Sequence, residues 1–154
     1  EDGAKSLGGN SLGAGIQYFG VGPLHSYLHD QKAVNVVLQA IEMIQPDAFI
    51  NLGDVGEWES VSAWRWKGKK QPPLEYQLPL IDEEIKLVNE GIDQFDRVLD
   101  KVGCDERYLL AGNHDEWLTY GFCERYPYME DYTFLKACRW KERGYKYYEY
   151  NREF

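Results

Sequence analysis

The chain has 154 residues, 44% of them apolar and 28% charged, a composition typical of a soluble globular domain with its own hydrophobic core. The formal net charge of −9 argues against broad, non-specific binding to nucleic acid or anionic membranes, and no apolar run approaches the roughly 18 residues that span a bilayer. The three cysteines lack CxxC spacing, so we expect free thiols in a cytoplasmic protein.

The sequence of the amino-terminal third predicts a leader, a strand and a helix. Residues 1–15 are rich in Gly and Ser and have no apolar period, so we expect them to form a flexible leader. One domain is expected to follow over 16–154. The apolar run IQYFGV at 16–21 predicts a buried strand. Apolar residues at helical spacing then predict a helix that begins after Asp30, its N-cap, and ends before Pro46.

The middle of the chain predicts a second strand and the longest helix. AFINL at 48–52 is the strand, and a polar, Trp-rich stretch follows it to about Pro79. A continuous apolar stripe predicts a helix over 82–102. Asp82 stands at its expected start, and Gly103 is the expected stop.

The last third begins with a third strand, RYLLA at 107–111. Residues 116–139 have a helical pattern with expected interruptions at Gly121 and Pro127. The run YKYYEY at 145–150 predicts another strand.

Buried strands that alternate with helices predict an α/β fold with a parallel sheet and right-handed crossovers. Ligands gather at the carboxyl ends of the strands in such sheets. Polar groups that suit metal binding follow three consecutive strands: His25, Asp54, and the pair Asn113 and His114. We therefore expect these side chains to converge on one rim of the sheet.

The chemistry of this rim fits a centre of two metal ions. A carboxylate such as Asp54 can bridge two cations, and an amide oxygen and an imidazole complete a ligand set that suits Mn, Fe, Zn or Ni. Two ions about 3.5–4 Å apart can clamp a phosphate and stabilise in-line displacement. His114 would then protonate the leaving alkoxide or stabilise charge on the phosphoryl oxygens.

Three segments carry a family resemblance. GPLHSYLHD at 22–30, GDVGE at 53–57 and GNHDE at 112–116 are similar to the three signature blocks of the calcineurin-like metallophosphoesterases. The likeness extends by pattern over roughly 16–120, and ESVSAWRWKGKK at 59–70 resembles phage and archaeal members. The resemblance implies an α/β sandwich of the metallophosphoesterase type, which hydrolyses phosphate mono- or diesters with two divalent ions.

The resemblance also implies roles for individual residues. His25 becomes a ligand of the first metal, and Asp54 bridges both. Asn113 becomes a ligand of the second metal and contacts the phosphate ester. His114 becomes the general acid or the histidine that orients the phosphate.

The chain departs from the family pattern in two ways. Pro23 stands where the family has the Asp of its Asp-x-His block, and no histidine follows His114. With so few ligands the chain should hold one metal ion or none tightly. We therefore expect residues 16–154 to form only the first half of the family's four-layer fold, inactive if the remaining ligands are missing.

Alternatives exist for the protein and for its residues. One is a non-catalytic binding module that retains the fold, which Pro23 favours. Another is a nucleic-acid-processing phosphodiesterase that uses the basic Trp loop 64–70, although the net charge opposes this. Asp54 and Asn113 are also ordinary turn residues. Glu57 and Asp115 are expected to be solvated or to support the site rather than to bind metal. His29 is expected to be a residue of the rim rather than a metal ligand.

Overall fold

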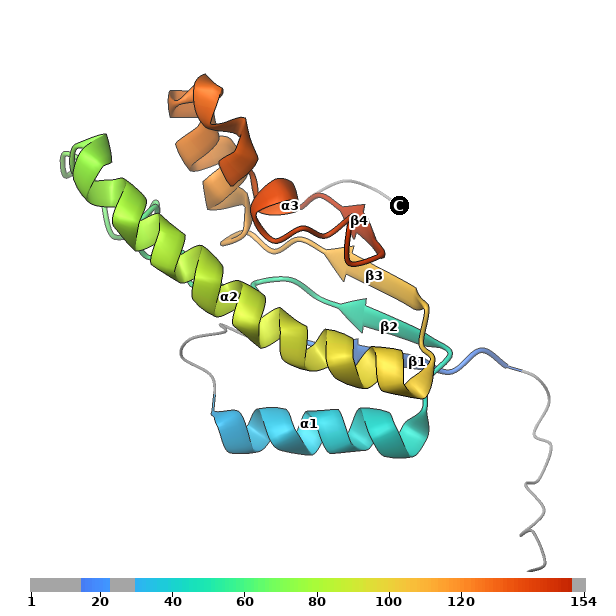
Figure 1. Ribbon diagram of the computed structural model, residues 1–154. Helices are drawn as coiled ribbons and strands as arrows, with labels where there is room; N and C mark the ends of the chain where they lie inside the picture. The colour runs from blue at the N-terminus through green and yellow to red at the C-terminus, as the bar shows by residue number, and fades with distance from the viewer. Residues whose placement is uncertain (1–14, 23–29, 151–154) are drawn as a thin grey trace, which may run out of the picture.

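The computed structural model describes residues 15–22 and 30–150 (Figure 1). The predicted leader, apart from Gly15, and the residues Pro23, His25 and His29 lie outside this part of the chain. The elements follow in the order β1 (Tyr18–Val21), α1 (Gln31–Ile44), β2 (Ala48–Asn51), α2 (Leu74–Val102), β3 (Glu106–Leu110), the π-helix η1 (Trp117–Cys123), the 3-10 helix η2 (Pro127–Tyr132), α3 (Phe134–Ala137) and β4 (Tyr145–Tyr148).

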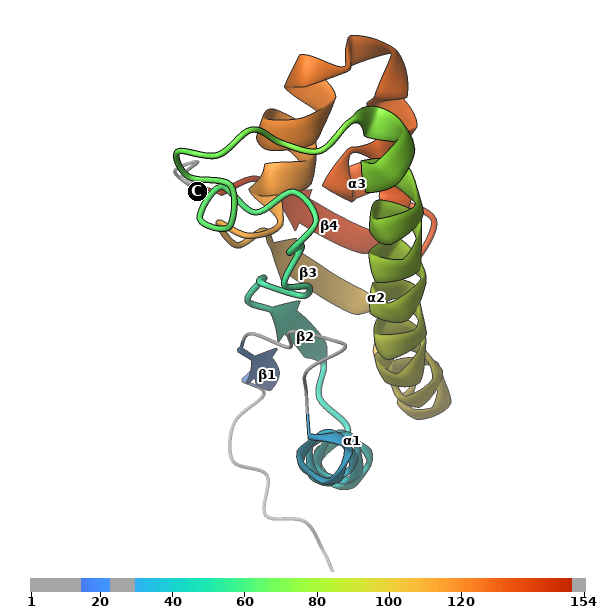
Figure 2. The ribbon, with the colours of Figure 1, turned by 90° about the vertical axis from the view of Figure 1, so that its left-hand side faces the viewer.

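The four strands form one parallel sheet in the order β1-β2-β3-β4, which confirms the predicted α/β class. Each strand lies beside its neighbour in the chain, and the connecting helices α1 and α2 lie on the same side of the sheet (Figure 2). This arrangement follows from crossovers of one hand between consecutive parallel strands. It brings the turns after β2 and β3 to the same edge.

The helix α1 begins and ends where the sequence predicts. The Asp30 side chain accepts a hydrogen bond from the backbone N–H of Lys32 at 2.8 Å and so caps the first turn. At the other end Gln45 adopts a left-handed conformation, and its N–H donates to the carbonyl of Ile41. Pro46 prevents a further turn.

The helix α2 begins at Leu74, eight residues before the predicted start, and Pro79 lies inside it. Asp82 is therefore not its N-cap. Tertiary contacts account for the difference: Gln77 is fully buried, and its Nε2 donates to the carbonyl of Ser60 at 2.7 Å. Burial of Ile81 adds apolar contact on the same side. These contacts outweigh the single backbone hydrogen bond that Pro79 cannot make.

We expect Pro79→Ala to raise the free energy of unfolding by about 1–3 kcal/mol, because a helix-interior proline is about 3 kcal/mol less favourable than alanine. Pro79 is exposed, so its replacement removes no core contact. Urea unfolding of the two proteins measures the difference. Pro72→Ala, in the segment before the helix, serves as the control and should not stabilise the protein. A destabilised Pro79→Ala protein would contradict this account of α2.

The segment between β3 and β4 is helical in short pieces. Pro127 begins η2, as the predicted interruption requires. The predicted interruption at Gly121 is wrong, because the π-helix η1 passes through this residue. No helix in the described part of the chain combines the length and apolar character needed to cross a membrane.

The core lies between the helices and one face of the sheet. Phe49 of β2 and Leu109 of β3 are fully buried, and the Phe49 ring lies 6.0 Å from the ring of Phe95 in α2. Neither α1 nor α2 lies on the opposite face (Figure 2). There, a groove of about 380 Å³ is lined mainly by apolar and aromatic side chains: Tyr18, Ile50, Leu52, Tyr108, Leu110 and Tyr148.

A polar network fastens α2 to β3 and β4. The Asp96 carboxylate accepts a hydrogen bond from the Tyr145 hydroxyl at 3.0 Å and pairs with Arg143 and, at 3.5 Å, with Arg107. Burial raises the pKa of Asp96, and the two guanidinium groups oppose that rise. The network fixes the helix against the sheet at a distance from the candidate site.

Candidate functional site

The turns that follow β2 and β3 lie against each other at the carboxyl edge of the sheet. The backbone N–H of His114 donates a hydrogen bond to Oδ1 of Asp54 at 3.0 Å. Asp54 is half-buried, and Asn113 is exposed beside it in the neighbouring turn. The structure thus brings together three of the four residues that the sequence predicts for the site. The fourth, His25, lies outside the described residues.

Two glycines permit this close approach. Gly53 has a φ of +79°, and a Cβ at this position would collide with the backbone nitrogen of Gly112. A Cβ on Gly112 would in turn collide with the Asp54 carboxylate. Gly112 itself does not have a positive φ, so its requirement is space rather than conformational freedom. The sequence analysis identified neither contact.

The turn after β2 is conformationally strained. Asp54 has a φ of 47° and Trp58 a φ of 50°, in the left-handed region that Asp adopts more readily than most residues but that a bulky side chain such as Trp rarely occupies. The tertiary structure maintains this conformation because the Trp58 ring is fully buried and lies edge-on to Phe134 at 6.0 Å. Strained conformations of this kind cluster at functional sites. The hydrogen bond from the His114 N–H holds the Asp54 carboxylate beside the turn that carries His114.

Asp115 holds the two turns together. Its carboxylate is fully buried and accepts hydrogen bonds from the N–H of Asp54 at 2.8 Å, Val55 at 3.1 Å and Gly112 at 2.9 Å, and from the Trp58 indole at 3.0 Å. Of the two positions expected for Asp115, solvated or supporting, the structure shows the supporting one, because the buried carboxylate binds the backbone of Asp54. Burial raises the pKa of Asp115 to about 7, although the N–H donors act in the opposite direction.

His114 is held between an aromatic ring and an acidic group. Its imidazole stacks on the Trp117 indole, with ring centroids 4.2 Å apart and an angle of 19° between the planes. Its Nδ1 lies 3.6 Å from Oε2 of Glu57, which makes an ion pair when the imidazole is protonated.

A cleft of about 470 Å³ opens against His114. Trp117 and Glu57 line it beside the imidazole, and the loop after β2 contributes Trp64 and Arg65. Its volume falls in the range of about 300–1,000 Å³ that is typical of small-molecule sites. The cleft can therefore admit a small organic molecule next to the imidazole.

The donors for a metal ion are incomplete within the described residues. There, no three His, Cys, Asp or Glu side chains lie close enough together to hold one ion. Asp54 and Asn113 supply a carboxylate and an amide oxygen from adjacent turns, a donor set that suits hard or borderline divalent ions. The chemistry of these two residues fits a metal ligand pair that needs a further donor.

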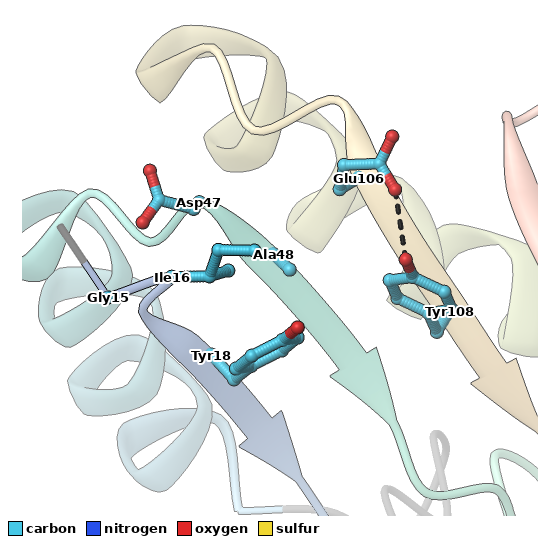
Figure 3. A pocket seen from close by; sticks show the side chains of 7 residues that line it. All are labelled: Gly15, Ile16, Tyr18, Asp47, Ala48, Glu106 and Tyr108. Carbon is cyan, nitrogen blue, oxygen red and sulfur yellow. Dashed lines mark hydrogen bonds between the residues drawn. The ribbon is translucent and has the colours of Figure 1, made fainter.

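A larger hollow, of about 520 Å³, lies elsewhere. Its lining includes Tyr18, Ala48 and Glu106, the first residues of β1, β2 and β3, so it lies at the amino ends of the strands (Figure 3). Glu106 is already engaged, because it accepts hydrogen bonds from Tyr108 at 3.0 Å and Lys146 at 2.6 Å. This hollow lacks the imidazole and amide groups of the carboxyl edge.

A supporting position for Asp115 is predicted from the sequence, but its contact with the Trp58 indole is not. An Asp that directly follows Gly-Asn-His, at the end of a buried strand, is a residue whose side chain can satisfy the N–H groups of nearby turns. Trp58 carries an indole N–H that requires an acceptor when the ring is buried. Together these features give a signal for such a contact, although only coordinates show that the two side chains meet.

Comparison of the chain with protein families, curated proteins and solved structures finds no match in any of the three.

Proposed function

We propose that this protein is a metal-dependent phosphoesterase that hydrolyses phosphate mono- or diesters at the carboxyl edge of its sheet. The observation that carries the proposal is the position of Asp54, whose carboxylate is held by a hydrogen bond beside the turn of Asn113 and His114. A carboxylate, an amide and an imidazole in adjacent turns suit both metal binding and phosphoryl transfer. The resemblance of the Gly-Asp and Gly-Asn-His-Asp segments to the calcineurin-like metallophosphoesterases points the same way.

In this proposal Asp54 and Asn113 hold divalent ions, and His25 provides the further donor. Bound ions would supply Lewis-acid polarisation of the phosphoryl group and lower the pKa of water. The Asp54 carboxylate contributes the negative charge that attracts the cations. The exposed Asn113 amide provides a neutral oxygen that binds without adding charge to repel the substrate.

His114 donates a proton to the leaving group. Stacking on Trp117 fixes the plane of its ring, and Oε2 of Glu57 lies 3.6 Å from its Nδ1. A protonated imidazole can donate to the ester oxygen as the bond to phosphorus breaks, or to a phosphoryl oxygen. Trp117 and Glu57 act as positioning residues, because they contact the imidazole and orient its ring rather than meet the phosphate.

The variant His114→Gln tests this role. We expect its kcat for an alkyl phosphodiester to fall about 100-fold or more with Mn²⁺ present, because general acid catalysis contributes factors of about 10²–10⁴. The loss should be smaller for bis(4-nitrophenyl) phosphate, whose leaving group needs little protonation. Equal losses for both esters would assign His114 to the phosphoryl oxygens instead.

The control is Lys141→Gln, which removes an exposed basic side chain from the turn before β4. Its turnover should equal that of the wild type. Addition of EDTA should stop hydrolysis by both proteins. Failure of the wild type to release product with Mn, Zn, Fe or Ni ions would overturn the proposed function for this chain.

A further inference from the structure

We infer that the cleft beside His114 binds a nucleobase, and that the substrates of this site are mononucleotides. The inference rests on the proposed function, because it names the organic group that the phosphate ester carries. The juxtaposition of an exposed indole, an imidazole stacked on a second indole, and acidic groups in one cleft supports it. A planar ring that bears hydrogen-bond donors fits such a lining.

Trp64 is the surface on which the base would stack. Its side chain is 69% exposed, whereas Trp58 and Trp140 are fully buried. Trp66, two residues along the same loop, folds back and donates its indole N–H to the carbonyl of Ser60 at 3.2 Å. Trp64 is therefore the member of this group that is available to a ligand. Stacking on an aromatic side chain stabilises a bound base whatever its identity, because every base has a π-face.

Polar groups around Trp64 favour a base over other aromatic rings. Glu59 lines the cleft and provides a carboxylate acceptor, which suits the exocyclic amino groups of bases. Arg65 forms an ion pair with Glu59 at 2.6 Å. Lys67 places its Nζ 5.2 Å from the centroid of the Trp64 ring, which adds positive charge beside the stacking surface.

Charge limits the ligand to a short one. The net charge of −9 opposes the approach of a long nucleic acid, because its phosphodiester backbone binds proteins chiefly through many cationic side chains. A mononucleotide presents a single phosphate, which the proposed metal ligands at the sheet edge would meet while the base occupies the cleft.

The test is a binding titration with adenosine 5′-monophosphate in EDTA, which removes metal ions and prevents hydrolysis. We expect Trp64→Ala to weaken binding about tenfold, and Trp64→Phe to keep most of the affinity because it retains an aromatic face. Tyr128→Ala, which removes an exposed ring outside the cleft lining, is the matched control and should bind like the wild type. Adenosine should compete, and ribose 5-phosphate should not.

Four results would overturn the inference: no binding of adenosine 5′-monophosphate to the wild type, equal binding to Trp64→Ala, equal binding of ribose 5-phosphate, or tighter binding of O-phosphotyrosine. The two proposals fail separately. If the protein binds the nucleotide through Trp64 but hydrolyses no phosphate ester, the proposed function is wrong and the base-binding cleft stands. If the protein hydrolyses phosphate esters but binds adenosine 5′-monophosphate no less tightly after Trp64→Ala, the proposed function stands and the base-binding cleft is wrong.

Discussion

Asp115→Ala is expected to lower the free energy of unfolding by about 4 kcal/mol or more, because four buried N–H donors lose their acceptor and each unsatisfied donor costs about 1–3 kcal/mol. The donors belong to Asp54, Val55, Gly112 and the Trp58 indole. Domains of this size are stable by about 5–15 kcal/mol in total. The substitution should therefore remove a large share of the stability.

Urea unfolding followed by tryptophan fluorescence measures this loss, because Trp58 and Trp140 are fully buried in the native protein. Asp115→Asn should be intermediate, since its amide oxygen still accepts from some of the donors. Asp105→Ala removes an exposed carboxylate and should change stability by no more than about 0.5 kcal/mol. If Asp115→Ala unfolds within about 1 kcal/mol of the wild type, the two turns are not held together through Asp115.

Most of the fold follows from local patterns in the sequence. Short apolar runs predict the first three strands, and the Tyr-rich run at 145–150 predicts the fourth. The Asp30 cap and the Gly103 stop predict one end of each long helix correctly. The parallel arrangement follows from the long connections between consecutive strands. A short hairpin joins antiparallel strands, whereas parallel strands need a crossover of a dozen or more residues. Periodicity and capping are local properties, so a single sequence carries them.

The features that could not be predicted depend on contacts between distant parts of the chain. The early start of α2 depends on Gln77, whose partner Ser60 lies in the preceding loop. The anchoring of Asp96 depends on Arg143 and Tyr145, which follow it by more than forty residues in the sequence. The burial of Asp115 likewise depends on the turn after β2. Propensity and spacing do not encode such pairings.

The candidate site was predictable in part. The adjacency of Asp54 and His114 follows from parallel strands whose carboxyl ends meet at one edge. The left-handed conformation of Asp54 does not follow from its identity alone, although Asp adopts this region more readily than most residues. The stacking of His114 on Trp117 follows their spacing along the chain, since residues three apart face each other on a helical turn.

Asp54→Asn is expected to reduce Mn²⁺-dependent hydrolysis of bis(4-nitrophenyl) phosphate about 1,000-fold or more, because metal ions contribute several kcal/mol of transition-state stabilisation. The substitution removes the negative charge of the side chain and keeps its size. Asparagine also tolerates the left-handed conformation, and its side-chain oxygen can still accept the hydrogen bond from the N–H of His114. The fold should therefore survive while the anionic ligand is lost.

Two comparisons make this result specific. The urea unfolding curve of Asp54→Asn should match that of the wild type, which separates loss of activity from loss of structure. Asp105→Asn removes one exposed negative charge from the opposite end of β3 and should leave hydrolysis unchanged. Equal turnover by Asp54→Asn and the wild type would exclude Asp54 as an essential metal ligand.

The binding isotherm of Mn²⁺, measured by calorimetry on the wild type and on Asp54→Asn at the same pH, examines the metal site without reference to any substrate. Our interpretation predicts that the wild type binds at least one ion per chain and that the variant binds it about 100-fold more weakly or not at all, because an anionic ligand has become neutral. Absence of binding to the wild type, or identical isotherms for the two proteins, would contradict a divalent-metal site at this edge of the sheet.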